Sequence, residues 1–131
     1  ALGQGISSRS SEVIHAGLYY PEDSLKASLC CRGRELLYEF CAARGVGHSK
    51  LGKLIVASGE AGIPELEALK VRGDALGVPG LTLLASTALH HKAPAPRGTA
   101  ALWSPETGIV DSHGLMLKNI NIYLLHVQQI I

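Results

Sequence analysis

The sequence predicts a mixed α/β fold of the α+β kind, in which short strands and longer helices alternate along one chain. Two patterns lead to this prediction. Apolar runs rich in β-branched residues, such as 13–16 and 54–56, are typical of buried strands. Between these runs, apolar residues recur every third or fourth position over 25–40 and 66–76, which is the spacing of helices that cover one side of a sheet.

Length and composition restrict the class of protein. The 131 residues suit a single domain, and 47% are hydrophobic, so a packed core is expected rather than disorder. The net charge is +1 without a clustered basic excess, and we therefore expect no nucleic acid partner. No apolar run is long enough to cross a bilayer. The N-terminus has neither an initiator Met nor the regions of a signal peptide, which indicates a processed or cut start. We expect a cytoplasmic location.

The cysteines do not predict a disulfide framework or a metal site. There are three, an odd number without metal-ligand spacing, and all fall on one expected helix: Cys30, Cys31 and Cys41. They are interpreted as small, buried apolar residues of a reducing compartment.

The first stretch with chemical character combines small hydroxyl residues with one cation. It consists of Ser7, Ser8, Arg9, Ser10 and Ser11. Their hydroxyl and N–H groups can meet oxygens such as those of a phosphate. In the strand that follows, alternation places Val13, His15 and Gly17 on one face, which leaves room for a flat group beside His15. The simpler interpretation is a polar loop that enters a core strand, with His15 hydrogen-bonded inside.

A helix is expected to begin after Ser24, which is a favourable N-cap, and to end at Gly45 and Gly47. Gly33 lies on its apolar stripe, and the expected reason is the close approach of another element. The stripe, interpreted as the packing face, contains Leu25, Leu29, Gly33, Leu36, Leu37 and Phe40.

The next elements are a strand over 50–58 and a second helix that opens near Pro64 and closes at Gly77. The inner face of this helix is expected to hold Leu66, Leu69, Gly73 and Leu76. A short strand over 81–84 follows.

The remaining third is harder to interpret. Residues 86–98 are expected to form a solvated loop, in which the adjacent His90 and His91 point in different directions and make a poor chelating pair. A strand over 100–103 leads through a tight turn to a return strand at 109–110. Asp111 or Ser112 could cap another helix, and 119–123 alternates like a strand.

Four stretches resemble one family in the same order. Ser-Ser-Arg-Ser-Ser-Glu-Val-Ile-His-Ala-Gly-Leu-Tyr-Tyr-Pro (7–21) resembles the flavin-contacting segment of FAD-dependent oxidoreductases of the D-amino-acid oxidase superfamily. The branch it resembles is the L-2-hydroxyglutarate oxidase/dehydrogenase group. Residues 24–41, 52–57 and 104–112 resemble the same branch. The resemblance covers about 5–117, and the tail from Lys118 shows no counterpart.

The resemblance implies a partial two-domain flavoprotein fold that lacks the N-terminal dinucleotide-binding βαβ unit. Gly3-Gln4-Gly5 does not supply the missing glycine fingerprint. Residues 1–44 correspond to a flavin-domain segment and linking helix, and 45–110 to part of the substrate-domain sheet with a packed helix. Residues 111–131 form a return segment and a divergent tail, which could arise from an altered reading frame, a splice variant or a truncated gene product.

The implied cofactor is FAD, which accepts a hydride from a carbon that bears a hydroxyl or amine next to a carboxylate. His15 would be the catalytic base or an orienting group, because its ordinary pKa lies near neutrality. Ser7, Ser8, Ser10 and Ser11 would contact FAD, and Arg9 would lie near cofactor or substrate anions. The family commonly has Asn where this chain has Ser10.

Two functions remain open. The chain is either the middle portion of an FAD-dependent enzyme that oxidises L-2-hydroxyglutarate or a related 2-hydroxy or 2-amino acid, or a non-catalytic fragment or interaction module that binds no cofactor alone. The first leaves the electron acceptor unidentified, and the chain by itself is expected to be inactive. The second predicts self-association through exposed apolar faces. The sequence contains no nucleophile elbow, P-loop or metal motif.

Overall fold

The computed structural model describes residues 5–128, so the expectations for Gly3, Gln4 and residues 129–131 lie outside the described part. The mixed α/β class is confirmed. The elements are η1 (Ile6–Arg9), β1 (Val13–Ile14), α1 (Leu25–Arg44), β2 (His48–Ser49), β3 (Lys53–Ala57), η2 (Glu60–Gly62), α2 (Ile63–Ala75), β4 (Thr82–Ala85), α3 (Ser86–Lys92), β5 (Ala100–Ser104), β6 (Gly108–Val110) and α4 (Ser112–Gln128).

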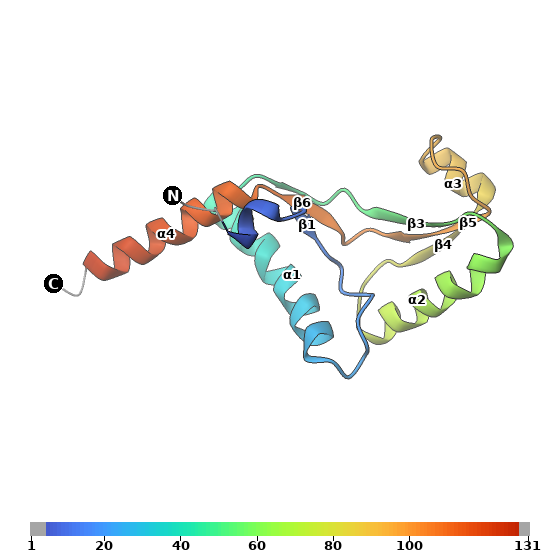
Figure 1. The fold of residues 1–131 in the computed structure, drawn as a ribbon, viewed down its shortest axis with the longest axis horizontal. Helices are drawn as coiled ribbons and strands as arrows, with labels where there is room; N and C mark the ends of the chain where they lie inside the picture. Colours follow the sequence, from blue (N-terminus) through green and yellow to red (C-terminus); the bar gives the residue numbers. More distant parts are fainter. Residues whose placement is uncertain (1–4, 129–131) are drawn as a thin grey trace.

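The strands form two antiparallel sheets, which lie end to end in Figure 1. The first sheet has the order β1-β6-β2, and the second has the order β3-β5-β4. The expected turn after β5 is present, but β5 and the return strand β6 belong to different sheets and do not pair with each other. Residues 105–107 therefore connect the two sheets.

Two apolar clusters join the sheets to the helices that pack on them. One lies between the second sheet and α2, and its members include Leu66, Leu81 and Leu102. The other lies between the first sheet and α1, around Ile14, Cys41 and Val110. Figure 1 shows α2 running along the second sheet, α3 at its far end, and α4 extending away from the rest of the molecule.

The second helix packs as its sequence predicts. Leu66 and Gly73 are buried, and Pro64 occupies the first turn. A Cβ added to Gly73 would overlap the side chain of Leu81, so the absence of a side chain allows α2 to approach the strand that follows it. Gly77 closes the element with a φ of +72°.

The ends of α1 are also as predicted, since Ser24 Oγ accepts a hydrogen bond from Ala27 N and Gly45 adopts the left-handed conformation. Its predicted packing face is correct only in part, since Leu37 and Phe40 pack against the core around Ile14 and Cys41. Leu25, Leu29 and Leu36 are exposed by 73%, 61% and 46%. The residues of α1 that are buried are Ala27, Arg34 and Cys41, none of which belongs to the predicted stripe.

The physical reason is that residues 15–18 lie close to α1 on a face of small side chains. A Cβ on Gly17 would lie 2.7 Å from Cys31 Sγ. The expected close approach at Gly33 is wrong as well, because no heavy atom lies within 4 Å of a Cβ added there. Cys41 is fully buried, whereas Cys30 and Cys31 are half-buried, and all three thiols are free.

Two late segments are helical against expectation. Residues 86–92 form α3, in which Leu89 is fully buried. Ser86 Oγ also donates to Gly98 O, which ties the start of this helix to the chain beyond Pro94. Residues 119–123 lie inside α4, where the apolar spacing also suits a helix. The predicted cap is confirmed, since Asp111 Oδ1 accepts from Gly114 N at 2.9 Å.

Within residues 5–128, no helix combines the length and apolar character required to cross a membrane.

Candidate functional site

A cavity of about 370 Å³ lies where the two sheets meet, and we call it the site cavity. It is lined by Ser11, Val13, His15, Leu51, Gly52, Lys53, Thr107, Gly108 and Ile109. Three separate segments of the chain therefore form its walls, and one of them is the segment that carries the predicted catalytic histidine.

His15 reaches the site cavity because of the strand before it. Ile14 pairs with Gly108 of β6 and is buried in the core, so alternation turns the next side chain outward. His15 is exposed, and the interpretation of a histidine hydrogen-bonded inside the core is wrong. Val13 shares its face as predicted, whereas Gly17 is buried against α1.

The opposite wall of the site cavity includes Gly52 and Lys53 at the start of β3. Gly52 N donates to Thr107 O at 2.8 Å, which fixes the start of the strand to the link between the sheets. Lys53 Nζ lies 4.8 Å from the centre of the Tyr19 ring, and this cation–π contact orients the ammonium group. Sequence reasoning had assigned Lys53 to plain sheet structure. A charged residue at the start of an otherwise apolar strand was the available signal.

The serine-rich segment is only partly at the site cavity. Ser11 lines it, whereas Ser7, Arg9 and Ser10 are exposed outside its lining, and Ser8 lies in η1. The segment is ordered by its own contacts, since Ser10 N donates to Ser7 O and Glu12 N donates to Ser10 Oγ. The hydroxyl of Ser10 thus already accepts a backbone hydrogen bond.

Glu12, which sequence reasoning missed, holds this segment in place. It has a φ of +58°, a strained conformation for a residue other than glycine. Its carboxylate accepts from both Ser112 N and Ser112 Oγ, at 3.2 and 2.8 Å, at the start of α4. Its backbone carbonyl accepts from Val110 N. The strain and the contacts together fix the chain direction between the serines and His15.

Neither Cys30 nor Cys41 on α1 has the character of an activated nucleophile. Burial, and secondly the neighbouring Cys31, raise the pKa of the Cys30 thiol, although Arg34 acts in the opposite direction. Burial alone raises the pKa of Cys41. Among the described residues, no group of three or more His, Cys, Asp or Glu side chains could hold a metal ion.

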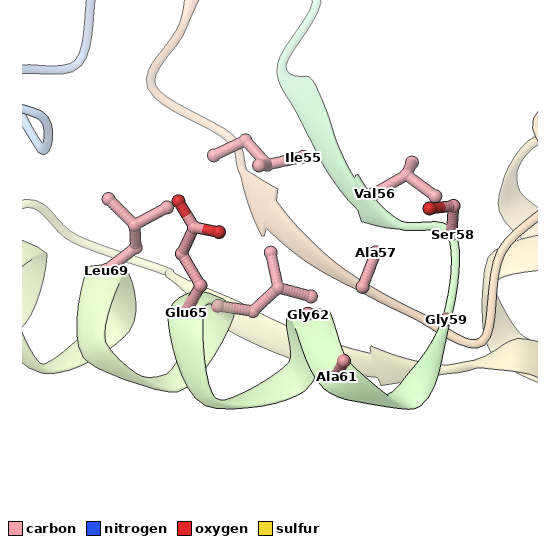
Figure 2. Close-up of a pocket in the computed structure, with 10 residues that line it drawn as sticks. Ile55, Val56, Ala57, Ser58, Gly59, Ala61, Gly62, Glu65 and Leu69 are labelled. Atoms are coloured by element: carbon pink, nitrogen blue, oxygen red, sulfur yellow. The ribbon is translucent and has the colours of Figure 1, made fainter.

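A second cavity, of about 450 Å³, lies between the end of β3 and the start of α2. Figure 2 shows Glu65 rising from α2 toward Ile55, with Leu69 beside it. Glu65 is the one ionisable group in the lining of this cavity, which contains none of the predicted site residues. The site cavity is therefore the better candidate for chemistry.

Comparison with known families gives the decisive observation. The FAD dependent oxidoreductase family (DAO) matches residues 1–122. The chain belongs to this family. The match passes beyond Leu117, so the tail does have a family counterpart over its first residues. The cofactor of the family is FAD.

Several curated relatives carry the same name. The L-2-hydroxyglutarate dehydrogenase, mitochondrial, of Arabidopsis thaliana is 49% identical over 118 residues, which cover 90% of this chain and 24% of that protein. The protein of the same name from Homo sapiens is 47% identical over 109 residues, covering 83% of this chain and 24% of its own length. The chain thus spans about a quarter of the length of these relatives. Their names contradict the expectation of a cytoplasmic location, which was wrong.

Solved structures share the fold. The L-alpha-glycerophosphate oxidase of Mycoplasma pneumoniae, determined with FAD bound, has a TM-score of 0.81 at 27% identity, over 90% of this chain and 33% of that one. Glycine oxidase from Geobacillus kaustophilus has a TM-score of 0.76 at 20% identity, over 90% of this chain and 34% of that one, and shows the fold alone.

The residues of the site cavity fit the ring end of FAD rather than the whole molecule. The volume falls within the range of about 300–1,000 Å³ that small-molecule sites occupy. Its lining offers a hydroxyl at Ser11, an imidazole at His15 and apolar surface at Val13 and Ile109, which suits a flat ring with polar edges. The sequence holds no glycine fingerprint for the pyrophosphate.

Proposed function

We propose that this chain is the middle portion of an FAD-dependent oxidoreductase that oxidises L-2-hydroxyglutarate or a closely related 2-hydroxy or 2-amino acid. The observation that carries the proposal is the meeting of His15, Ser11 and Lys53 in one cavity between two sheets. The names of the relatives support the choice of substrate. Those names also support a mitochondrial location.

His15 is the base in this proposal. Its imidazole has an ordinary pKa near neutrality and can take the proton of the substrate hydroxyl at a ring nitrogen. Bound FAD would supply the acceptor for the hydride, which no side chain can provide. Lys53, across the cavity, would bind a carboxylate of the substrate and so place its hydroxyl near His15.

The serine-rich segment would hold the cofactor. Ser11 would contact the ring end, whereas Ser7, Ser8, Arg9 and Ser10 would contact parts of FAD that lie outside the site cavity. The remaining half of the flavin domain would come from sequence beyond this chain. We keep the division into 1–44, 45–110 and 111–131 as part of this proposal.

A graft tests the function. The segment of the Arabidopsis thaliana relative that matches this chain is replaced by residues 1–122, and the purified product is examined for flavin absorbance and for oxidation of 2-hydroxy acids. We expect a yellow protein that oxidises L-2-hydroxyglutarate and prefers it over glycine and proline. A flavin-loaded graft that is inactive toward L-2-hydroxyglutarate would contradict the proposal.

One observation favours the alternative of an interaction module for the chain alone. Leu25, Leu29 and Leu36 form an exposed apolar line on α1. Sedimentation of the isolated chain, with and without Leu29→Lys, distinguishes the two. A stable oligomer that dissociates in the variant, together with absent flavin binding in the graft, would favour the alternative.

A further inference from the structure

A buried charge contacts two of the segments that form the site cavity. The side chain of Arg34 on α1 is only 3% exposed, and it is the one charged side chain among the buried residues of the described part. A buried guanidinium is costly unless each of its donors meets an acceptor. Its partners therefore indicate what it does.

Arg34 contacts two segments that are distant in sequence. Its Nη1 donates to Ala16 O at 2.9 Å, one residue after His15. Its Nε lies 3.7 Å from Glu106 Oε2, in the link between the two sheets. This Nε is buried and makes no hydrogen bond, and the Glu106 carboxylate is the acidic group that pairs with it. On the exposed side, Nη2 lies 3.5 Å from Glu35 Oε1.

Glu106 extends the network to the third wall of the site cavity. Lys50 Nζ donates to both Glu106 carboxylate oxygens, at 3.2 and 3.0 Å, and lies 4.9 Å from the centre of the Tyr38 ring. Tyr38 Oη donates to the Glu106 backbone carbonyl at 3.1 Å. Both oxygens of the carboxylate and the carbonyl behind it are thus engaged.

Three residues of the network lie one residue from the lining of the cavity. Ala16 follows His15, Glu106 precedes Thr107, and Lys50 precedes Leu51. The strand pairing that otherwise holds these walls is short, since β1 and β6 share two residue pairs. The network therefore adds a connection where the sheet supplies little.

We propose that Arg34 is a positioning residue, which ties the His15 segment to the Glu106 link and so holds the base in register with the opposite wall of the site cavity. The planar guanidinium can serve Ala16 and Glu106 at once, whereas a lysine ammonium is a single point charge. The effect of Arg34 on catalysis rests on the proposed function, whereas its role in joining the His15 segment to Glu106 does not.

The first arm of the test uses the 131-residue chain and needs no activity. Isotope-labelled histidine is introduced, and the ring resonances are followed through a pH titration in the wild type, Arg34→Lys and Arg34→Met. Arg32→Lys is the matched control, because Arg32 lies on the same helix with a side chain 63% exposed. His90 and His91 on the distant α3 are internal references.

We expect the His15 resonance to move in both Arg34 variants and to stay in the Arg32 control, with the references unchanged. An unmoved His15 resonance in Arg34→Lys would overturn the inference. So would a common shift of all histidines or loss of the fold in both Arg34 variants, because either result would make Arg34 a general structural residue.

The second arm uses the flavin-loaded graft. We expect Arg34→Lys to lower kcat about tenfold or more, since small misplacements of catalytic groups cost up to about a hundredfold, while KM and flavin content change less than about twofold. Glu106→Gln should behave alike, and the double variant should be no worse than either single one. Additive losses of kcat in the double variant would show that Arg34 and Glu106 act independently and would overturn the inference. If the wild-type graft is inactive, the proposed function fails, and the histidine arm still decides the role of Arg34.

Discussion

The two sheets differ in how much of their own core they contain. In the second sheet, β3 and β5 pair over five residues, and Leu102 of β5 and Leu89 of the adjoining α3 are fully buried. In the first sheet, each pairing covers two residues, and the helix beside it exposes Leu25 and Leu29. The difference teaches that the second sheet lies in a well-filled core, to which Ala16 and Leu18 also contribute, whereas α1 beside the first sheet carries apolar surface that the described residues leave uncovered. The site cavity lies at their junction.

The largest effect on stability should come from the core of the second sheet. Leu102→Ala removes a fully buried side chain and should lower the free energy of unfolding by about 2–5 kcal/mol. Leu29→Ala on α1 is the matched substitution, and at 61% exposure it should change stability by no more than about 0.5 kcal/mol. Urea unfolding of the two variants measures this contrast. Equal losses of unfolding free energy in the two variants would show that Leu29 on α1 is buried in solution.

Two glycine substitutions should change stability in opposite directions. Gly52 has a φ of +75°, and a Cβ there would overlap the Trp103 ring, so Gly52→Ala should cost at least about 1–3 kcal/mol. Gly33 lies inside α1 with open space around it, and Gly33→Ala should stabilise by about 0.5–1 kcal/mol. Thermal unfolding provides the measurement. If Gly33→Ala lowers the stability instead, the result would support the close approach of another element that the sequence predicted at Gly33.

The same comparison explains which predictions succeeded. The inner face of α2 was predicted correctly because Leu66 and Gly73 pack against strands of the same chain. The face of α1 was predicted only in part, since Leu37 and Phe40 pack against the core but an apolar stripe does not reveal which of its residues a partner covers. Leu29 is exposed, whereas the small Ala27 is buried.

The residues of the site cavity were also predicted only in part. Alternation along β1 placed His15 on a face with Val13, and the cavity confirms that they share it. Glu106 could not be recognised, because its role depends on contacts between segments more than 30 residues apart, such as that with Lys50. Lys53 offered only the signal of a charged residue at the start of an apolar strand. A strand pattern also cannot show that two neighbouring strands belong to different sheets, as β5 and β6 do.

A smaller effect should sharpen the account of the junction. Burial, and secondly the Glu106 carboxylate, raise the pKa of Tyr38 above its ordinary value of 10.0, with Arg34 opposing. The unfolded chain then loses this proton at lower pH than the folded chain. Folding stability is therefore unaffected below the ordinary pKa and is lost as pH rises through the raised one.

Tyr38→Phe removes this titration along with one hydrogen bond. The variant should begin less stable near neutral pH and then lose less stability than the wild type as pH rises above the ordinary tyrosine pKa of about 10. Unfolding curves at several pH values provide the measurement. Parallel losses in the two proteins would show that Tyr38 does not keep its proton longer in the folded state.

The most direct test of the account is the turnover of the grafted enzyme with L-2-hydroxyglutarate when His15 is replaced by Ala. His91→Ala is the control, because His91 is exposed on α3 at the far end of the second sheet. The account predicts that His15→Ala lowers kcat by about 10²–10⁴-fold with flavin content nearly unchanged, as for loss of a general base, while the control retains activity. Unchanged turnover in His15→Ala would contradict the assignment of the site cavity as the catalytic centre.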